Sequence, residues 1–123
     1  MHRGTARRVL DAQAPSDDDA PLVLLSTLPT VDKAAEIARI LVEERLCACV
    51  NLVPQVRSIY AWEGSISDET ETLAVIKTIR RCHDALVTRL VSLHPYQVPE
   101  VITLQPIGGH APYLAWITET VRR

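Results

Sequence analysis

Apolar and polar residues follow two distinct periods along the chain from about residue 21 onward. The run PLVLLST, residues 21–27, predicts a short strand that Pro29 closes. Thr30 then stands where a hydroxyl caps a helix, and apolar residues recur at helical spacing as far as residue 46. The apolar stripe of this helix is Ala34, Ile37, Ala38, Leu41 and Val42. Charged residues occupy the other side, which predicts an amphipathic helix covering a sheet.

The middle of the chain predicts a long β-hairpin. Residues 47–62 are rich in β-branched and aromatic residues, a turn is expected around Gly64, and residues 70–79 return as the partner strand. The segment SDETE, residues 67–71, is expected to be a solvated turn. Pro54 has no backbone N–H, so it indicates a bulge or kink midway along the first strand.

The rest of the chain predicts a helix, a strand and a short C-terminal helix. The second helix ends at His94-Pro95, because proline cannot continue the helical hydrogen bonds. Residues 100–107 follow as a strand, and Pro112 begins the last helix. The two apolar stripes are Cys82, Leu86, Leu90 and Leu93, and Tyr113, Trp116, Ile117 and Val121. The order βαββαβ plus a helix predicts an α+β fold, a ferredoxin-like sandwich.

The predicted hairpin is long for so small a domain. Residues 47–62 span about 50 Å when extended. The first helix is only about 24 Å long, and a domain of this size has a radius of gyration of about 13 Å. The hairpin must therefore bend or project, which exposes strand edges and apolar side chains that soluble proteins normally cover. We expect copies of the chain to cover one another in a homo-oligomer.

Composition narrows the class of protein. The 123 residues fit one domain, placed at residues 21–123, and the polar residues 1–20 are expected to be a disordered tail. A formal net charge of −2 gives no attraction to nucleic acid. No apolar run approaches the roughly 20 residues that span a membrane, and no secretory signal is recognisable. An odd number of cysteines does not suit a disulfide framework, which indicates a cytoplasmic protein.

Cys47 and Cys49 alternate along the predicted strand. Their side chains would face one way about 7 Å apart, too far for a disulfide. They are either two small buried apolar residues or a thiolate pair for a soft metal.

Four segments carry a resemblance to a known family. They are ACVNLVPQVRSIYAWEG, ETLAVIKT, LHPYQVPEVI and YLAWI, and the match runs from about Leu22 to Val121. Together they resemble the CutA family of divalent-cation tolerance proteins. The resemblance implies a ferredoxin-like fold, a tight homotrimer built through the hairpin arms, and an architecture like that of the PII proteins. It also implies a link to tolerance of copper and other divalent metals, with copper binding in some members and no established catalytic activity.

The resemblance also bears on metal ligands. Metal-binding members carry a cysteine in the first strand, where this chain has Ser26, and a histidine pair where it has Leu93 and His94. Cys49 matches a cysteine of the family. The resemblance thus implies His94 and Cys49 as ligands of copper or another divalent metal. From the residues alone, His94 is either a helix C-terminal residue or a ligand at a subunit junction.

The loop HPYQVPE, residues 94–100, is stiff and carries polar side chains. We place Tyr96 and Glu100 at a ligand cleft between subunits, together with Trp62 and with Lys77 from an otherwise apolar strand. Tyr96 and Glu100 either fix the loop by hydrogen bonds or perform acid–base chemistry. Lys77 needs a structural carboxylate partner or an anionic ligand.

Aromatic residues concentrate in the cores of protein interfaces. We therefore expect Tyr60, Trp62 and Trp116 at the trimer interface.

The chain has no P-loop, dinucleotide fingerprint, CxxC pair or nucleophile elbow, and it is not expected to be an enzyme. The main hypothesis is a trimeric CutA-type protein that acts in metal tolerance by binding or signalling. One alternative is a PII-like sensor of a small anionic metabolite, with Lys77 as its cation. The other is an enzyme that uses Tyr96, Glu100 and Lys77.

Overall fold

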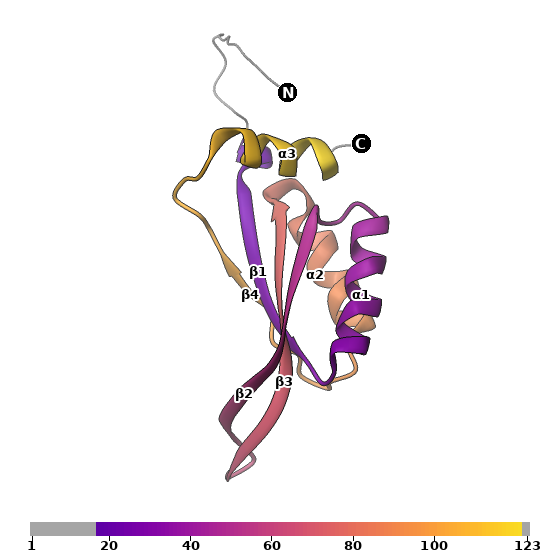
Figure 1. Cartoon of the computed structure of the whole chain (residues 1–123), viewed down its shortest axis with the longest axis vertical. Helices are drawn as coiled ribbons and strands as arrows, with labels where there is room; N and C mark the ends of the chain where they lie inside the picture. Colours follow the sequence, from indigo (N-terminus) through magenta and orange to yellow (C-terminus); the bar gives the residue numbers. More distant parts are fainter. Residues whose placement is uncertain (1–16, 122–123) are drawn as a thin grey trace, which may run out of the picture.

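The computed structural model describes residues 17–121. Within them, a four-stranded antiparallel sheet in the order β2-β3-β1-β4 combines with three α-helices in an α+β fold. The elements are η2 Asp17–Asp19, β1 Pro21–Leu28, α1 Val31–Glu43, β2 Cys49–Trp62, β3 Ser65–Ile79, η3 Arg80–Cys82, α2 His83–Leu93, β4 Ile102–Leu104 and α3 Ala111–Val121. Helices α1 and α2 lie side by side on one face of the sheet, and α3 crosses its upper end (Figure 1).

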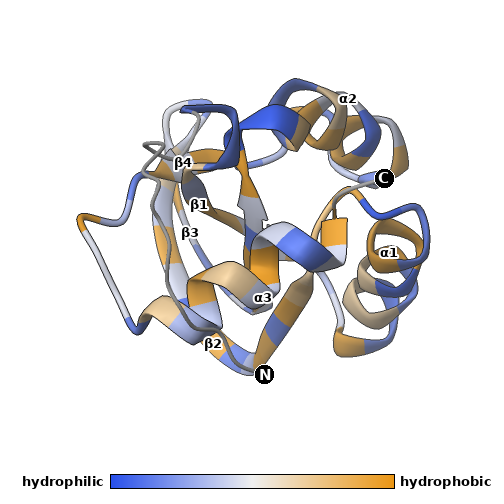
Figure 2. Cartoon of the chain, turned by 90° about the horizontal axis from the view of Figure 1, so that it is seen from above, coloured by the Kyte–Doolittle hydropathy of each residue, from blue (hydrophilic) through white to orange (hydrophobic). Residues whose placement is uncertain are grey.

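Strand β1 shows where the core lies. Its residues alternate between buried and partly exposed, since successive side chains point to opposite faces of a sheet. Leu24 and Leu28 belong to the buried cluster that the sheet forms with α1 and α2. Val23 and Leu25 point to the other side, which we call the open face. In the view from above, α1 and α2 stand together on one side of the sheet, and each carries both hydrophobic and hydrophilic segments (Figure 2).

Helix α1 begins as predicted and ends earlier. The Thr30 hydroxyl accepts a hydrogen bond from the backbone N–H of Lys33 at 3.1 Å, which confirms the cap. At the other end, Arg45 takes a left-handed backbone conformation with φ 59°. The helix therefore stops at Glu43, rather than continuing to residue 46.

The β2–β3 hairpin extends well past α1 and α2 (Figure 1). The pairing shifts register between Val53 and Val56, so Pro54 marks a bulge as predicted. Glu63 and Gly64 join the strands with φ of 50° and 82°, the positive values that a two-residue hairpin turn requires.

The expectation of a solvated turn at residues 67–71 is wrong, because β3 already begins at Ser65. The charged residues of this segment are held by cross-strand partners. Arg57 donates two hydrogen bonds to Asp68, at 2.9 and 2.7 Å, across the hairpin. The predicted fourth strand is also shortened, to Ile102–Leu104.

The predicted N-terminal tail lies largely outside the described residues. Its last part is placed: Asp17–Asp19 form a 3-10 turn, and Asp19 forms an ion pair with Arg81 at 3.0 Å. Among the helices of residues 17–121, none is long and apolar enough to cross a membrane.

Candidate functional site

A groove of about 1060 Å³ lies between the β2–β3 hairpin and the loop after α2. We call it the Tyr96 groove. Its main polar and aromatic residues are Tyr60, Trp62, Glu69, Glu71, Tyr96 and Glu100. The structure thus brings together three of the four residues predicted at a ligand cleft, namely Trp62, Tyr96 and Glu100.

Tyr96 is held at the floor of this groove by a buried carboxylate. Its hydroxyl donates to Glu71 Oε2 at 2.6 Å, and Glu71 is only 7% exposed. Burial, and then the hydrogen bond to Glu71, raise the pKa of the Tyr96 phenol. A phenol in this setting keeps its proton and acts as a hydrogen-bond donor. The sequence pointed to Glu100 as the neighbour of Tyr96 and missed Glu71, which lies where the expected turn and the expected strand overlap.

The outer part of the groove is acidic. The Tyr60 hydroxyl donates to Glu69 Oε1 at 2.7 Å, and this bond is the main cause of a raised pKa at Tyr60. Arg57 is the only cation among the described lining residues, and Asp68 already binds it in a bidentate pair. The carboxylates of Glu69, Glu71 and Glu100 therefore give the groove a surplus of negative charge, which favours a cationic ligand.

His94 is buried next to the groove, with both ring nitrogens in use. Nε2 lies 2.8 Å from the carbonyl oxygen of Thr27, and Nδ1 lies 3.1 Å from the backbone nitrogen of Tyr96. A carbonyl only accepts and an amide N–H only donates, so the ring is neutral with its proton on Nε2. Burial lowers the pKa of His94, against the opposing effects of Thr27 and Glu71. Binding a metal would require the ring to give up one hydrogen bond.

The predicted ligand pair does not meet within one chain. Cys49 pairs through Lys77 with Val23, whereas His94 is bonded to Thr27, four residues along β1. Four strand residues correspond to about 13 Å. Residues 17–121 contain no group of three or more His, Cys, Asp or Glu side chains arranged to hold a metal ion. The metal role of His94 and Cys49 remains a prediction that concerns an assembly of chains.

The side chains of Ser26, Cys47 and Cys49 are buried or partly buried. Ser26 is fully buried, and its hydroxyl oxygen has no hydrogen-bond partner within the described chain. Cys47 belongs to the main core, while Cys49 packs against the cluster under α3. Burial is the main cause that raises the pKa of Cys47 to about 12, so its thiol stays protonated. The expectation that the two cysteines face one way along a strand is wrong, because β2 begins at Cys49 and the two side chains belong to different clusters. Cys47 is thus a small buried apolar residue.

Lys77 lies apart from the Tyr96 groove, on the open face beneath α3. Its Nζ is 3.2 Å from the hydroxyl of Tyr113 and 5.5 Å from the centre of that ring. Tyr113 stacks on Trp116 with ring centres 5.6 Å apart. Lys77 Nζ thus donates a hydrogen bond to the Tyr113 hydroxyl and lies at that edge of the ring, and the contacts of residues 17–121 include no carboxylate partner for it.

Comparison with known proteins identifies the family. Residues 22–120 match the family described as CutA1 divalent ion tolerance protein. The chain belongs to the CutA family. This confirms the resemblance that the four sequence segments carry.

Individual CutA proteins match over most of the chain. The divalent-cation tolerance protein CutA of Thermus thermophilus is 44% identical over 97 residues, covering 79% of this chain and 94% of that protein. Protein CutA of Homo sapiens is 48% identical over 93 residues, covering 76% of this chain and 52% of that protein. The chain therefore spans about half the length of the human relative. The names of these CutA relatives describe tolerance proteins or state no activity, and none describes an enzyme.

A solved CutA structure shares the fold. The crystal structure of CutA from Xylella fastidiosa superposes with a TM-score of 0.81 at 40% sequence identity, covering 84% of this chain and 99% of that one.

Proposed function

We propose that this CutA-family protein acts in divalent-cation tolerance as a cytoplasmic homotrimer, and that the Tyr96 groove binds the cation. The main supporting observation is the charge of the groove: Glu69, Glu71 and Glu100 line it without forming a three-ligand group within residues 17–121 of one chain, and Arg57 is paired with Asp68. The printed names of the relatives support the link to divalent cations.

The chemistry of the groove favours oxygen ligands. Carboxylate oxygens suit hard divalent ions, and a mixed set of oxygen and nitrogen ligands suits Cu(II) rather than Cu(I). His94 supplies nitrogen only after losing a hydrogen bond, so copper binding is expected to be modest in one chain. A neighbouring subunit would add the remaining ligands.

A trimer is supported by the apolar surface that one chain leaves uncovered. On the open face, Ile102 is 49% exposed and Leu104 is 47% exposed; on the hairpin, Ile66 is 74% exposed. The three aromatic residues expected at the interface are also exposed in the single chain: Tyr60 by 38%, Trp62 by 47% and Trp116 by 39%. Assembly would cover them. Soluble proteins normally cover such surface. The strand order and the two helices on one face suit the ferredoxin-like, PII-like trimer that the resemblance implied.

Calorimetric titration of the full chain with Cu²⁺ and Mn²⁺ tests the groove. We expect the double variant Glu69→Gln with Glu100→Gln to weaken binding, and His94→Ala to weaken Cu²⁺ more than Mn²⁺. Glu43→Gln removes an exposed carboxylate from α1 and is the matched control. If neither ion binds to the wild type, the groove is not a cation site and the tolerance link is indirect.

A second candidate keeps Lys77 as the cation of a PII-like metabolite sensor. The observation in its favour is that Lys77 Nζ contacts the Tyr113 hydroxyl and, within residues 17–121, forms no ion pair with a carboxylate. A thermal-shift screen of nucleotides and carboxylates, repeated on Lys77→Met, separates this candidate from the first. A hit that Lys77→Met leaves unchanged removes Lys77 from the site.

A further inference from the structure

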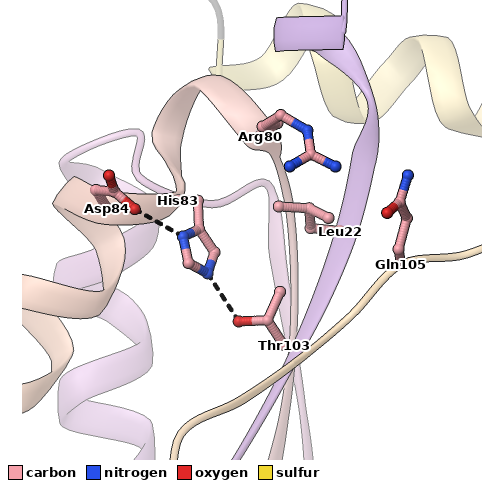
Figure 3. A pocket seen from close by; sticks show the side chains of 6 residues that line it. All are labelled: Leu22, Arg80, His83, Asp84, Thr103 and Gln105. Atoms are coloured by element: carbon pink, nitrogen blue, oxygen red, sulfur yellow. Dashed lines mark hydrogen bonds and ion pairs between the residues drawn. The ribbon is translucent and has the colours of Figure 1, made fainter.

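A second cavity, separate from the Tyr96 groove, lies between the start of α2 and strand β4. Its volume is about 420 Å³, within the range of about 300–1,000 Å³ typical of ligand pockets. The side chains that line it are Leu22, Arg80, His83, Asp84, Thr103 and Gln105 (Figure 3). They come from three places in the sequence, which only the folded sheet brings together.

A chain of hydrogen bonds orders one wall of this cavity. His83 Nδ1 lies 2.9 Å from Asp84 Oδ1, and His83 Nε2 lies 2.7 Å from Thr103 Oγ1 (Figure 3). An ionised carboxylate only accepts, so Nδ1 carries the hydrogen, and in the neutral ring Nε2 accepts from the hydroxyl of Thr103. The contact with Thr103 orients the imidazole and the hydroxyl, whereas the Asp84 side chain is fully exposed to solvent, with one oxygen turned to the ring.

Arg80 provides an unused positive charge. Its guanidinium lies beside Leu22, with His83 on one side and Gln105 on the other (Figure 3). Within residues 17–121, no carboxylate lies within ion-pair distance of Arg80. Its neighbour Arg81, by contrast, binds Asp19 at 3.0 Å. Gln105 likewise has no side-chain hydrogen bond among the described contacts, which leaves its amide hydrogens available.

We propose that this cavity binds the phosphate group of a small phosphomonoester. The planar fork of Arg80 matches two phosphate oxygens, and the amide of Gln105 supplies a donor for the third. Donors on separate chain segments suit a tetrahedral group better than a planar carboxylate. Leu22 lies under this wall but is only 3% exposed, so the polar side chains provide most of the recognition and the organic part extends toward solvent.

This site is independent of the cation groove. It has the opposite charge preference and shares none of its lining residues. Failure of one proposal therefore leaves the other standing.

Titration calorimetry of the full chain with phenyl phosphate, at constant ionic strength, tests the proposal. We expect Arg80→Gln to weaken binding by about tenfold or more, since it removes charge-assisted hydrogen bonds. Gln105→Leu is expected to weaken binding several-fold. Arg39→Gln is the matched control, because it removes an exposed arginine from the outer side of α1. Circular dichroism and thermal unfolding check that each variant is folded.

Three results would overturn the proposal. The first is no heat of binding from phenyl phosphate on the wild type. The second is equal affinity in the wild type and Arg80→Gln, which would move the phosphate elsewhere. The third is benzoate binding as tightly as phenyl phosphate, which would assign the cavity to carboxylates.

Discussion

At the scale of single residues, the hydrogen bond from Tyr96 to Glu71 is the most consequential contact of the groove. Its length is 2.6 Å, and the carboxylate that it satisfies is almost fully buried. We expect Tyr96→Phe to lower the free energy of unfolding by about 1–3 kcal/mol, because Glu71 is nearly buried and water replaces its lost donor only in part. Urea denaturation at fixed protein concentration measures this change.

Tyr60→Phe is the matched control for that variant. Its hydroxyl donates to Glu69 on the exposed part of the hairpin, where water replaces the lost donor. The free energy of unfolding of Tyr60→Phe is expected to lie within about 0.5 kcal/mol of the wild-type value. Equal losses in the two variants would show that burial of Glu71 does not determine the effect.

His94 predicts a pH dependence of stability. Burial lowers the pKa of His94 in the folded chain, so the unfolded chain binds the proton more readily. The free energy of unfolding should therefore fall as the pH drops from the unfolded pKa of about 6.5 through the lower folded pKa. Titration of His94 alone changes the free energy of unfolding by at most about 1.4 kcal/mol per pH unit.

Replacing His94 by Asn should flatten the pH dependence below neutral pH. His110→Asn changes an exposed histidine and is the control. Chemical denaturation between pH 5 and 8 gives the two slopes. The same slope in wild type and His94→Asn would mean that other groups carry the pH dependence.

Single residues with local signals were predictable from the sequence, and contact partners were not. Thr30 acts within one helical turn, and Pro54 acts on its own strand. Tyr96 and Glu71 are 25 positions apart, so nothing in the local pattern joins them. For Lys77 the sequence left open a carboxylate partner or an anionic ligand, and its partner in the structure is Tyr113, which is 36 positions away.

At the scale of elements, the end of α1 is held in a strained backbone conformation. Arg45 N–H donates to the carbonyl of Val42 and Leu46 N–H to that of Leu41, each at 3.0 Å, with Arg45 at φ 59°. This is a Schellman motif, whose left-handed position usually holds glycine. We expect Arg45→Gly to raise the free energy of unfolding by about 1 kcal/mol, since glycine adopts this conformation without strain. Chemical denaturation measures the gain.

The variant Arg45→Ala separates the effect of backbone strain on stability from the effect of losing the arginine side chain. Alanine removes the guanidinium but keeps a Cβ atom in the left-handed region, so its stability should remain close to that of the wild type. If alanine stabilises as much as glycine does, the gain comes from loss of the side chain.

The type of each element was predictable, and some boundaries were not. In the halves of the strands that face the core, buried and partly exposed residues alternate, so the two-residue period of a strand is visible in the sequence. The outer half of the hairpin contacts no core, and polar residues occupy both of its faces. Residues 67–71 therefore resembled a turn although they form a strand, which the pairing of Arg57 with Asp68 supports.

At the scale of the whole molecule, the length of the hairpin predicted its projection. The cavity beside β4 was not foreseen, because it depends on the order of strands in the sheet. The sequence spacing of His83, Asp84 and Thr103 does not indicate a binding site. These residues come together because β4 lies next to β1 and near α2. Part of the Tyr96 groove was predictable from the sequence, because Tyr96 and Glu100 lie in one stiff loop.

The open face carries the last prediction, which concerns the oligomeric state. We expect the wild type to sediment as a trimer at micromolar concentration, and Ile102→Glu to shift it to smaller species. Ile102 lies opposite Leu25 on the open face and is 49% exposed, so a charge there is tolerated in one chain but not inside an apolar interface. Val91→Glu is the matched control, because Val91 is 45% exposed on α2, away from the open face. Analytical ultracentrifugation distinguishes the outcomes: a monomeric wild type contradicts the trimer, and a trimeric Ile102→Glu places the interface elsewhere.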